Sequence, residues 1–170
     1  MFGEADKLKD WKDLEASLNG AFSARAKGFL GSKFSLSASD GEFGVLRLEG
    51  SGGASFEVGG IEGRIEPSGS RRRMSVGDEA ILTAGREGSG LWIEVGGAAF
   101  DANMSLLRNT ASARSAEGRE VARVSGGISN RSYEASFGEG SMAVAVFLLF
   151  HLAATRRRAF RASTATPAGR

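Results

Sequence analysis

The chain has 170 residues, of which 41% are hydrophobic and 25% charged. This composition favours one folded domain and argues against wholesale disorder or a polytopic membrane protein. The chain has no cysteine and one histidine, which excludes disulfides, thiolate nucleophiles and Cys- or His-rich metal centres, and we expect no cofactor. The formal net charge is +2, but the last fifteen residues hold five arginines and no acid. The rest of the chain is therefore acidic, which disfavours nucleic acid as a partner.

The first predicted element is a short amphipathic helix within residues 1–20. Its apolar residues recur at three- and four-residue steps, at Leu8, Trp11, Leu14 and Leu18. Asn19-Gly20 follows the last of them and is a typical helix stop. The mixed charges of this segment are incompatible with a secretory signal, so we expect a cytoplasmic protein. The helix is also a candidate contact for a protein partner.

From Lys33 to Phe137 the apolar residues alternate with polar ones, and glycines separate the alternating segments. Phe34–Ala38 and Phe43–Leu48 flank Asp40-Gly41, which predicts a hairpin. Further candidate strands are Ala54–Val58, Ile61–Glu66, Arg71–Val76, Glu79–Ala84, Leu91–Val95, Ala98–Leu106, Ala111–Arg114, Glu120–Ser125 and Arg131–Phe137. Many short strands at roughly ten-residue spacing, with no helix between them, predict an antiparallel sandwich or closed barrel.

The segment Met142–Ala154 is apolar on every face, so as a helix it must be buried in protein or in lipid. As a helix, residues 142–155 would be about 21 Å long, against about 30 Å for the hydrocarbon core of a bilayer. The length favours a core helix over residues 141–154, ended by the arginines at 156–158, inside a barrel domain of residues 21–160. A flexible basic tail, 161–170, would follow. A membrane anchor over residues 142–155 is the alternative.

This order of elements resembles the tubby C-terminal-like superfamily, which includes the tubby proteins, the phospholipid scramblases and the LURP-one-related proteins. Glu117–Val124 is similar to a family hairpin arm of pattern G-x-x-V-A-x-V, and Arg131–Phe137 to an aromatic strand that precedes the apolar helix. Arg73–Thr83 and Leu91–Val95 look like its middle strands. The likeness covers most of residues 33–158 and is strongest to the small LURP-one-like members. It implies a closed barrel threaded by the helix, and either an association with membranes through phosphoinositide binding or lipid scrambling, or no known activity.

Two arginine clusters are candidate sites for an anionic head group, because a guanidinium pairs bidentately with phosphate. The first is Arg71, Arg72 and Arg73, where strand alternation turns Arg72 away from its two neighbours. The second is Arg156, Arg157, Arg158 and Arg161, after the apolar helix. These seven arginines could equally be solvated surface charges or, in the second cluster, complements to the helix dipole.

Other motifs indicate structure rather than chemistry. His151 lies in the apolar run without a catalytic triad motif, which indicates a hydrogen-bonded core histidine. Gly138–Ala143 fits a dinucleotide-binding pattern, but no second parallel strand follows, so a tight strand-to-helix turn is expected. Gly85–Gly90 is expected to be a flexible hairpin tip.

The sequence therefore predicts an all-β (mainly β) protein, a closed antiparallel barrel of about 12 short strands around a buried C-terminal hydrophobic helix. We expect no catalytic residues and no metal. The expected function is a non-enzymatic intracellular domain, peripheral at the membrane, that associates with anionic phospholipid head groups or a protein partner. The alternatives are a small-molecule-binding barrel, acting as a carrier or an enzyme, and a tail-anchored membrane protein.

Overall fold

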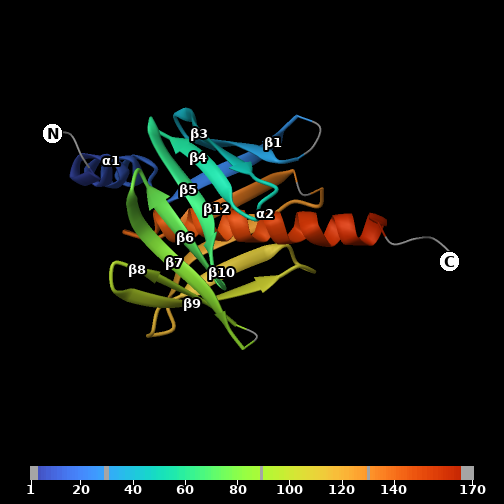
Figure 1. Cartoon of the computed structure of the whole chain (residues 1–170). Coiled ribbons are helices and arrows are strands. Elements are labelled where there is room, and N and C mark those ends of the chain that lie inside the picture. The colour runs from blue at the N-terminus through green and yellow to red at the C-terminus, as the bar shows by residue number, and fades with distance from the viewer. Residues whose placement is uncertain (1–3, 29–30, 89, 130, 166–170) are drawn as a thin grey trace.

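The computed structural model describes residues 4–28, 31–88, 90–129 and 131–165; the side chains of residues 4–8 and 161–165 lie outside the description. Within these ranges the chain forms two helices and twelve strands (Figure 1). The helices are α1 (Glu4–Ser17) and α2 (Met142–Ala165). The strands are β1 (Ala21–Lys27), β2 (Lys33–Ala38), β3 (Gly41–Leu48), β4 (Ala54–Val58), β5 (Ile61–Ser68), β6 (Arg71–Val76), β7 (Glu79–Glu87), β8 (Gly90–Val95), β9 (Ala98–Ser105), β10 (Thr110–Arg114), β11 (Glu120–Gly126) and β12 (Ser132–Phe137).

The strands form a closed antiparallel barrel, as the sequence predicts. Each strand pairs with the next in the chain, and β1 pairs with β12 to close the sheet. The eleven strands expected from the sequence are all present, but β1 was missed. The inward positions of β1 are Phe22, Ala24 and Ala26, and two alanines give too weak an apolar alternation to stand out.

Helix α2 fills the lumen, which confirms the prediction of a buried core helix. Every residue from Met142 to Phe150 is buried. The helix lies closest to β10, β11 and β12, whose inward-facing residues include four buried alanines, Ala111, Ala113, Ala122 and Ala135. The inward positions of β2–β8 carry larger side chains, including Phe34, Leu46 and Ile93. Small residues on one wall therefore allow the helix to approach it, and large residues on the other wall fill the remaining space.

The end of α2 differs from the expectation. The helix does not stop at the arginines but continues to Ala165, so the prediction of a helix over 141–154 followed by a tail from residue 161 is wrong in length. Arginine is a good helix former, and from about Ala154 the helix has left the barrel, where charged side chains can be hydrated. Among the described residues, neither helix is both long and apolar enough to cross a membrane.

Helix α1 closes the opposite end of the barrel (Figure 1). Trp11 packs on Phe56 with ring centroids 6.1 Å apart, and Leu18 is buried. The Glu15 carboxylate accepts a hydrogen bond from the backbone N–H of Gly140, at the turn into α2. The helix ends before Asn19 and Gly20, which both have positive φ, as the sequence predicts. Because the apolar face of α1 rests on the barrel, a protein partner could reach only its outer face.

The two ends of the barrel are named by these helices. The capped end holds α1, the loops that follow even-numbered strands and the turn from β12 into α2. The exit end holds the loops that follow odd-numbered strands and the part of α2 from Ala154 onward.

Candidate functional site

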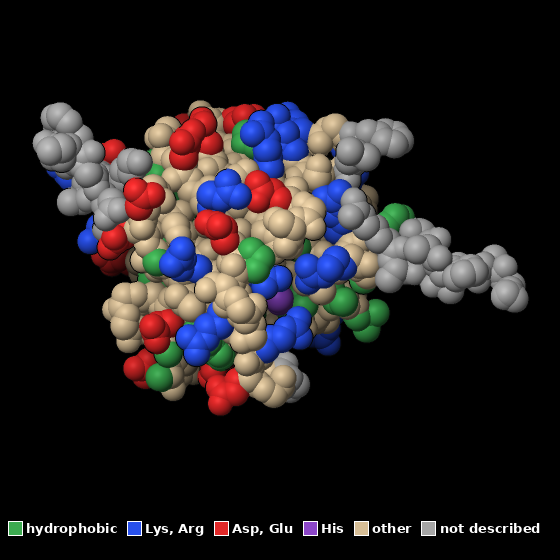
Figure 2. Space-filling view, in the orientation of Figure 1, with side chains coloured by type: hydrophobic (Ala, Val, Ile, Leu, Met, Phe, Trp, Pro, Cys, Tyr) green, Lys and Arg blue, Asp and Glu red, His purple; other side chains and the backbone are tan. Residues whose placement is uncertain are grey.

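A small cavity opens at the exit end, between α2 and the adjoining ends of β6 and β7. Its volume is about 80 Å³, and it is lined by three arginines and the only histidine. We call Arg72, Arg86, His151 and Arg158 the mouth cluster. Figure 2 shows the histidine at the surface with basic side chains around it. Phe147 and Phe150 form the inner wall of the cavity.

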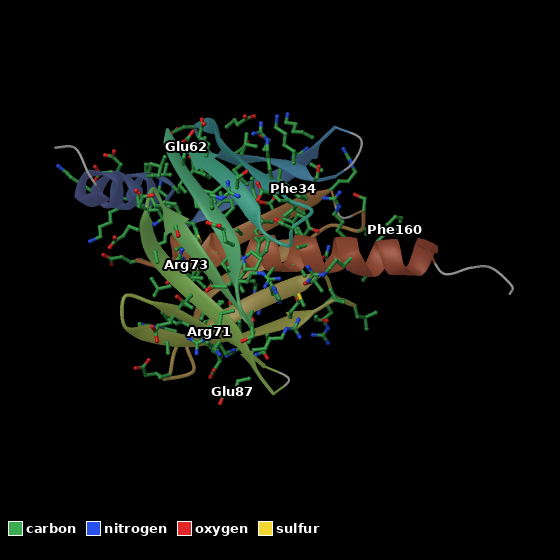
Figure 3. All side chains as sticks on the ribbon, viewed as in Figure 1. Phe34, Glu62, Arg71, Arg73, Glu87 and Phe160 are labelled. Carbon is green, nitrogen blue, oxygen red and sulfur yellow. The ribbon has the colours of Figure 1, made fainter. Side chains whose placement is uncertain are left out.

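The strand register brings two of these arginines together. Arg72 pairs with Ala84 across β6 and β7, so Arg86, two residues further along β7, lies diagonally opposite on the same face. The alternation that puts Arg86 on this face directs the exposed Glu87 to the other side, and Figure 3 shows Glu87 at the outer edge of the barrel. The Arg72 guanidinium extends toward the β3–β4 loop, where a Cβ on Gly52 would lie 3.7 Å from its Nη2.

Helix geometry supplies the other two members. His151 and Arg158 are seven residues apart, which is about two helical turns, so they share one face of α2. Phe147 lies one turn before His151, and the two rings stack with centroids 6.0 Å apart and planes inclined by 10°. This stacking fixes the imidazole at the inner end of the cavity.

The mouth cluster concentrates positive charge without a carboxylate partner. Within the described part of the chain, neither Arg72 nor Arg86 has an ion pair or hydrogen bond, and Arg158 Nη2 donates only to Thr155 Oγ1, at 3.4 Å on its own helix. Burial, and then the charges of Arg158 and Arg86, lower the pKa of Arg72. The three guanidiniums therefore repel one another, and a bound anion would relieve that repulsion.

His151 is uncharged at neutral pH. Burial, followed by the charges of Arg86, Arg158 and Arg72, lowers its pKa to about 4. A neutral imidazole both donates and accepts a hydrogen bond. The expectation of a hydrogen-bonded core histidine is wrong on this point, because the side chain is half-buried, faces the cavity and has no hydrogen bond to any described residue.

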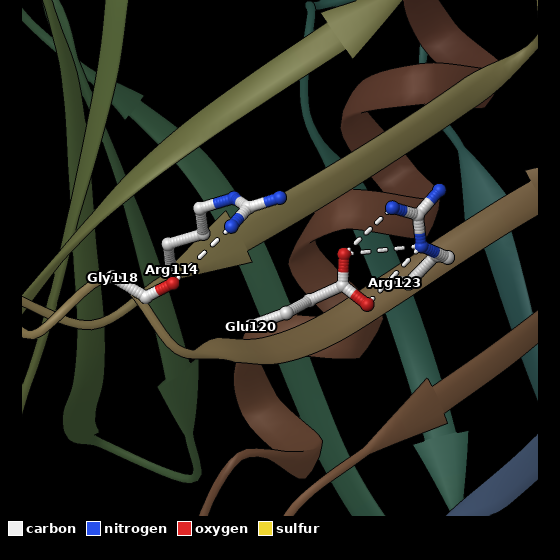
Figure 4. A network of polar contacts seen from close by, with 4 residues as sticks. All are labelled: Arg114, Gly118, Glu120 and Arg123. Carbon is white, nitrogen blue, oxygen red and sulfur yellow. Dashed lines mark hydrogen bonds and ion pairs between the residues drawn. The ribbon is translucent and has the colours of Figure 1, made fainter.

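Two arginines elsewhere on the barrel, Arg64 and Arg123, have acidic partners. On β11, Arg123 holds both carboxylate oxygens of Glu120, with distances from 2.7 to 3.2 Å, beside Arg114, which donates to the Gly118 carbonyl (Figure 4). This pairing lowers the pKa of Glu120, chiefly through the hydrogen bond from Arg123, and raises the pKa of Arg123. The mouth cluster lacks such a partner.

The structure separates the two arginine clusters expected from the sequence. Arg72 and Arg158 join the mouth cluster, whereas Arg71 and Arg73 face outward (Figure 3). The Arg71 guanidinium lies over the Trp92 ring, 5.3 Å from its centroid. Arg156 Nη1 donates to the Leu106 carbonyl at 2.6 Å. Arg157 lines a neighbouring surface hollow near the β3–β4 loop. The side chain of Arg161 lies outside the described residues.

Neither the place of Arg86 in the site nor the exposure of His151 was predicted from the sequence. Gly85–Gly90 was expected to be a hairpin tip, but β7 continues to Glu87, and only its pairing with β6 shows that Arg86 faces Arg72. Among the described residues, no group of three His, Asp or Glu side chains is placed to hold a metal ion.

A larger hollow of about 590 Å³ lies at the capped end, between α1 and the turn into α2. Its charged lining is mixed, from Lys12, Glu15 and Glu139, and Glu15 is already engaged by the backbone of Gly140. This hollow therefore lacks the concentration of one charge sign that marks the mouth cluster.

The fold defines a class of protein, the closed twelve-stranded barrel with a helix along its lumen. The chain shares this fold with a protein from Arabidopsis thaliana whose crystal structure superposes with a TM-score of 0.60, at 12% sequence identity, over 81% of this chain and 92% of that one. No protein-family model matches the sequence, and no curated protein matches it significantly.

Proposed function

We propose that this protein is a non-enzymatic, intracellular relative of the tubby C-terminal-like superfamily that associates with anionic phospholipid head groups. The observation that carries the proposal is the convergence of Arg72, Arg86 and Arg158 without a carboxylate partner among the described residues. Such a cluster costs stability unless an anion binds to it, and sites of this kind are typical of function.

The chemistry of the mouth cluster suits a phosphate group. Guanidinium forks bind phosphate oxygens bidentately, and the neutral imidazole of His151 can donate one further hydrogen bond. The cavity of about 80 Å³ is far smaller than the roughly 300–1,000 Å³ that encloses a drug-sized ligand. A single charged head group at the barrel surface fits this space better than a small molecule carried in the lumen, which α2 occupies.

The segments that carry the resemblance to the superfamily support the relationship. Glu117–Val124 spans the β10–β11 turn and most of β11, and Arg131–Phe137 coincides with β12, directly before α2. The shared barrel fold of the Arabidopsis protein agrees with this order of elements.

The test is co-sedimentation with phosphatidylcholine vesicles, either pure or mixed with an equal amount of phosphatidylserine. We expect binding to the anionic vesicles only, and about twenty- to thirty-fold weaker binding for the double variant Arg72→Gln/Arg86→Gln, since each arginine near an anionic leaflet contributes about 1 kcal/mol. The matched control is Arg114→Gln/Arg119→Gln, which removes the same charge at the capped end. Equal binding to neutral vesicles, or equal loss in both double variants, contradicts the proposal.

A competition arm separates a lipid head group from free phosphate. Inorganic phosphate added at the same ionic strength as chloride should displace little of the protein from anionic vesicles, because a bilayer engages many charges at once. Complete displacement by phosphate would identify a soluble phosphate compound as the ligand and would contradict membrane association.

A further inference from the structure

Charge is sorted between the two ends of the barrel. Among the residues whose side chains are described, the exit-end loops and the emerging part of α2 carry five arginines, Arg108, Arg131, Arg156, Arg157 and Arg158, and one acid, Glu49. Glu49 forms an ion pair with Arg64 at 3.2 Å. The loops at the capped end carry four acids, Asp40, Asp78, Glu117 and Glu139, and one base, Arg119. The barrel therefore has a positive exit end and a negative capped end.

Exposed apolar side chains are sorted in the same way. The large hydrophobic side chains that are exposed in the described part of the chain all lie at the exit end, and they are Leu106, Leu107, Ile128 and Phe160. Leu107 is 96% exposed and Ile128 is completely exposed. Figure 3 shows Phe160 on α2 beyond the barrel. We call these four residues the exit rim. Apolar side chains gathered at loop tips within a cationic surface indicate an interaction site.

The loops that carry the exit rim are braced against each other. Asn109, in the β9–β10 loop with Leu107, donates from its side-chain Nδ2 to the Gly127 carbonyl at 2.8 Å, and its backbone carbonyl accepts the Gly126 N–H at 2.8 Å. Asn109 is buried although it lies in a loop. A Cβ on Gly126 would lie 2.1 Å from Asn109 Nδ2, so glycine is required there.

The part of α2 outside the barrel is held to the β9–β10 loop, because Arg156 donates a hydrogen bond to the Leu106 carbonyl. The two loops and α2 thus hold Leu107, Ile128 and a row of arginines in a fixed arrangement. A preorganised surface loses little conformational entropy when it binds.

We propose that the barrel docks on an anionic phospholipid bilayer with its exit end toward the membrane, so that Leu107, Ile128 and Phe160 enter the interfacial layer while the arginines lie among the head groups. This proposal rests on the membrane association argued above and adds its orientation. Charge complementarity selects a bilayer as the occupant, because the same end presents both cations and apolar tips, and anionic lipid surfaces attract both. The negative capped end is repelled by the same surface, so the charge separation orients the barrel before contact.

Site-directed labelling tests the orientation. The chain has no cysteine, so Leu107→Cys, Ile128→Cys or Ala99→Cys each accepts one polarity-sensitive fluorophore. Ala99 is exposed near the capped end and is the control. On vesicles of equal phosphatidylcholine and phosphatidylserine, we expect blue-shifted emission and quenching by acyl-chain spin labels at positions 107 and 128, and neither change at position 99.

The possible results distinguish the two proposals. If the labelled proteins sediment with the vesicles but positions 107 and 128 do not respond, or position 99 responds as strongly, the orientation is wrong and the membrane association stands. If none of the proteins sediments, both proposals fail. If the labels at 107 and 128 respond to rising protein concentration without lipid, the exit rim is an interface between copies of this chain, which also overturns the orientation.

Unlabelled variants give a second measurement. Leu107→Ser and Ile128→Ser are expected to weaken vesicle binding about tenfold each, because each replaces an inserted apolar side chain with a polar one. Both side chains are exposed, so the thermal unfolding midpoint should stay within about 1 °C of the parent value. Asn109→Ala should weaken binding while leaving both apolar side chains in place, because it releases the brace between the loops. Unchanged binding in all three variants would overturn the proposal.

Discussion

The two ends of this barrel have the same kind of strand connection, but they differ in how the lumen is covered and in whether their arginines have acidic partners. At the capped end, α1 covers the lumen, and the arginine of β11 is matched to a carboxylate. At the exit end α2 leaves the lumen, and among the described residues the guanidiniums of Arg72 and Arg86 face one another there without an acid. The difference therefore comes from the helix at each end and from the charged residues that β6, β7 and β11 carry near their ends. The capped end pairs its charge and buries its apolar side chains, whereas the exit end retains unpaired positive charge, which the proposed anion would neutralise.

The largest expected effect is at the capped end. Trp11→Ala should lower the free energy of unfolding by about 3–5 kcal/mol, because it removes the buried indole that packs on Phe56. Lys12→Ala, an exposed change on the same helix, should cost less than about 0.5 kcal/mol. Urea denaturation measures both. The folded fraction of Trp11→Ala should still bind anionic vesicles as the parent does. If this folded fraction also binds more weakly, stability at the capped end and vesicle binding at the exit end are not separate.

The second effect concerns pH at the exit end. His151 has a pKa of about 4 in the folded protein and about 6.5 when unfolded. As pH falls from about 6.5 toward 4, the unfolded chain takes up a proton that the folded barrel does not, so stability is lost in this window, by about 3 kcal/mol. His151→Leu should lack this part of the pH dependence. Urea denaturation of the parent and of His151→Leu, at neutral and at mildly acidic pH, measures the difference. If both proteins lose the same free energy of unfolding on acidification, His151 is not the cause.

A smaller effect of opposite sign is expected at Arg72. Arg72→Met removes one of three repelling charges, so the barrel should become more stable by about 0.5 kcal/mol, a small gain because the side chain is partly solvated. Vesicle binding should weaken at the same time. Arg73→Met, on the outward face of the same strand, should change neither quantity much. Destabilisation by Arg72→Met would mean that its charge is satisfied in the free protein.

The smallest expected change in the free energy of unfolding is at the ion pair between Glu120 and Arg123, near the capped end. Glu120→Gln should cost about 0.2–1 kcal/mol, the usual value of an exposed ion pair. The hydrogen bond from Arg123 lowers the pKa of Glu120, so this contribution is present at neutral pH and is lost as pH falls below about 4.5. Thermal unfolding at low and high salt measures it. A change in vesicle binding would show that this end also contacts lipid.

Much of this fold could be predicted from the sequence, because its signals are local. The alternation of eleven strands, the glycine-marked turns and the all-apolar segment at Met142 each lie within about ten residues. Strand β1 was missed because small inward residues carry little periodic signal, yet it closes the barrel through its pairing with β12. The length of α2 was misjudged because an arginine run stops burial without stopping a helix.

The candidate site was harder to predict because it is assembled across the barrel. Arg72 and Arg158 lie in clusters that the sequence marks, but their convergence depends on how far β6 and α2 extend to the exit end. The sequence pattern around Arg86 is explained by a hairpin, and the pattern around His151 by an apolar helix. Neither pattern therefore indicates a site. Only the strand register and the rotation of α2 reveal that their side chains meet.

The order of the elements along the chain also determines when this protein can fold. Helix α2, which fills the barrel, follows all twelve strands in the chain. The pairing of β1 with β12 that closes the sheet joins residues 21–25 to residues 132–136. During synthesis all twelve strands therefore emerge from the ribosome before α2. Until α2 emerges, the inward-facing side chains of β2–β8 are exposed to water. Such a nascent chain can bury its core only once α2 has emerged, and until then its inward-facing apolar side chains can aggregate.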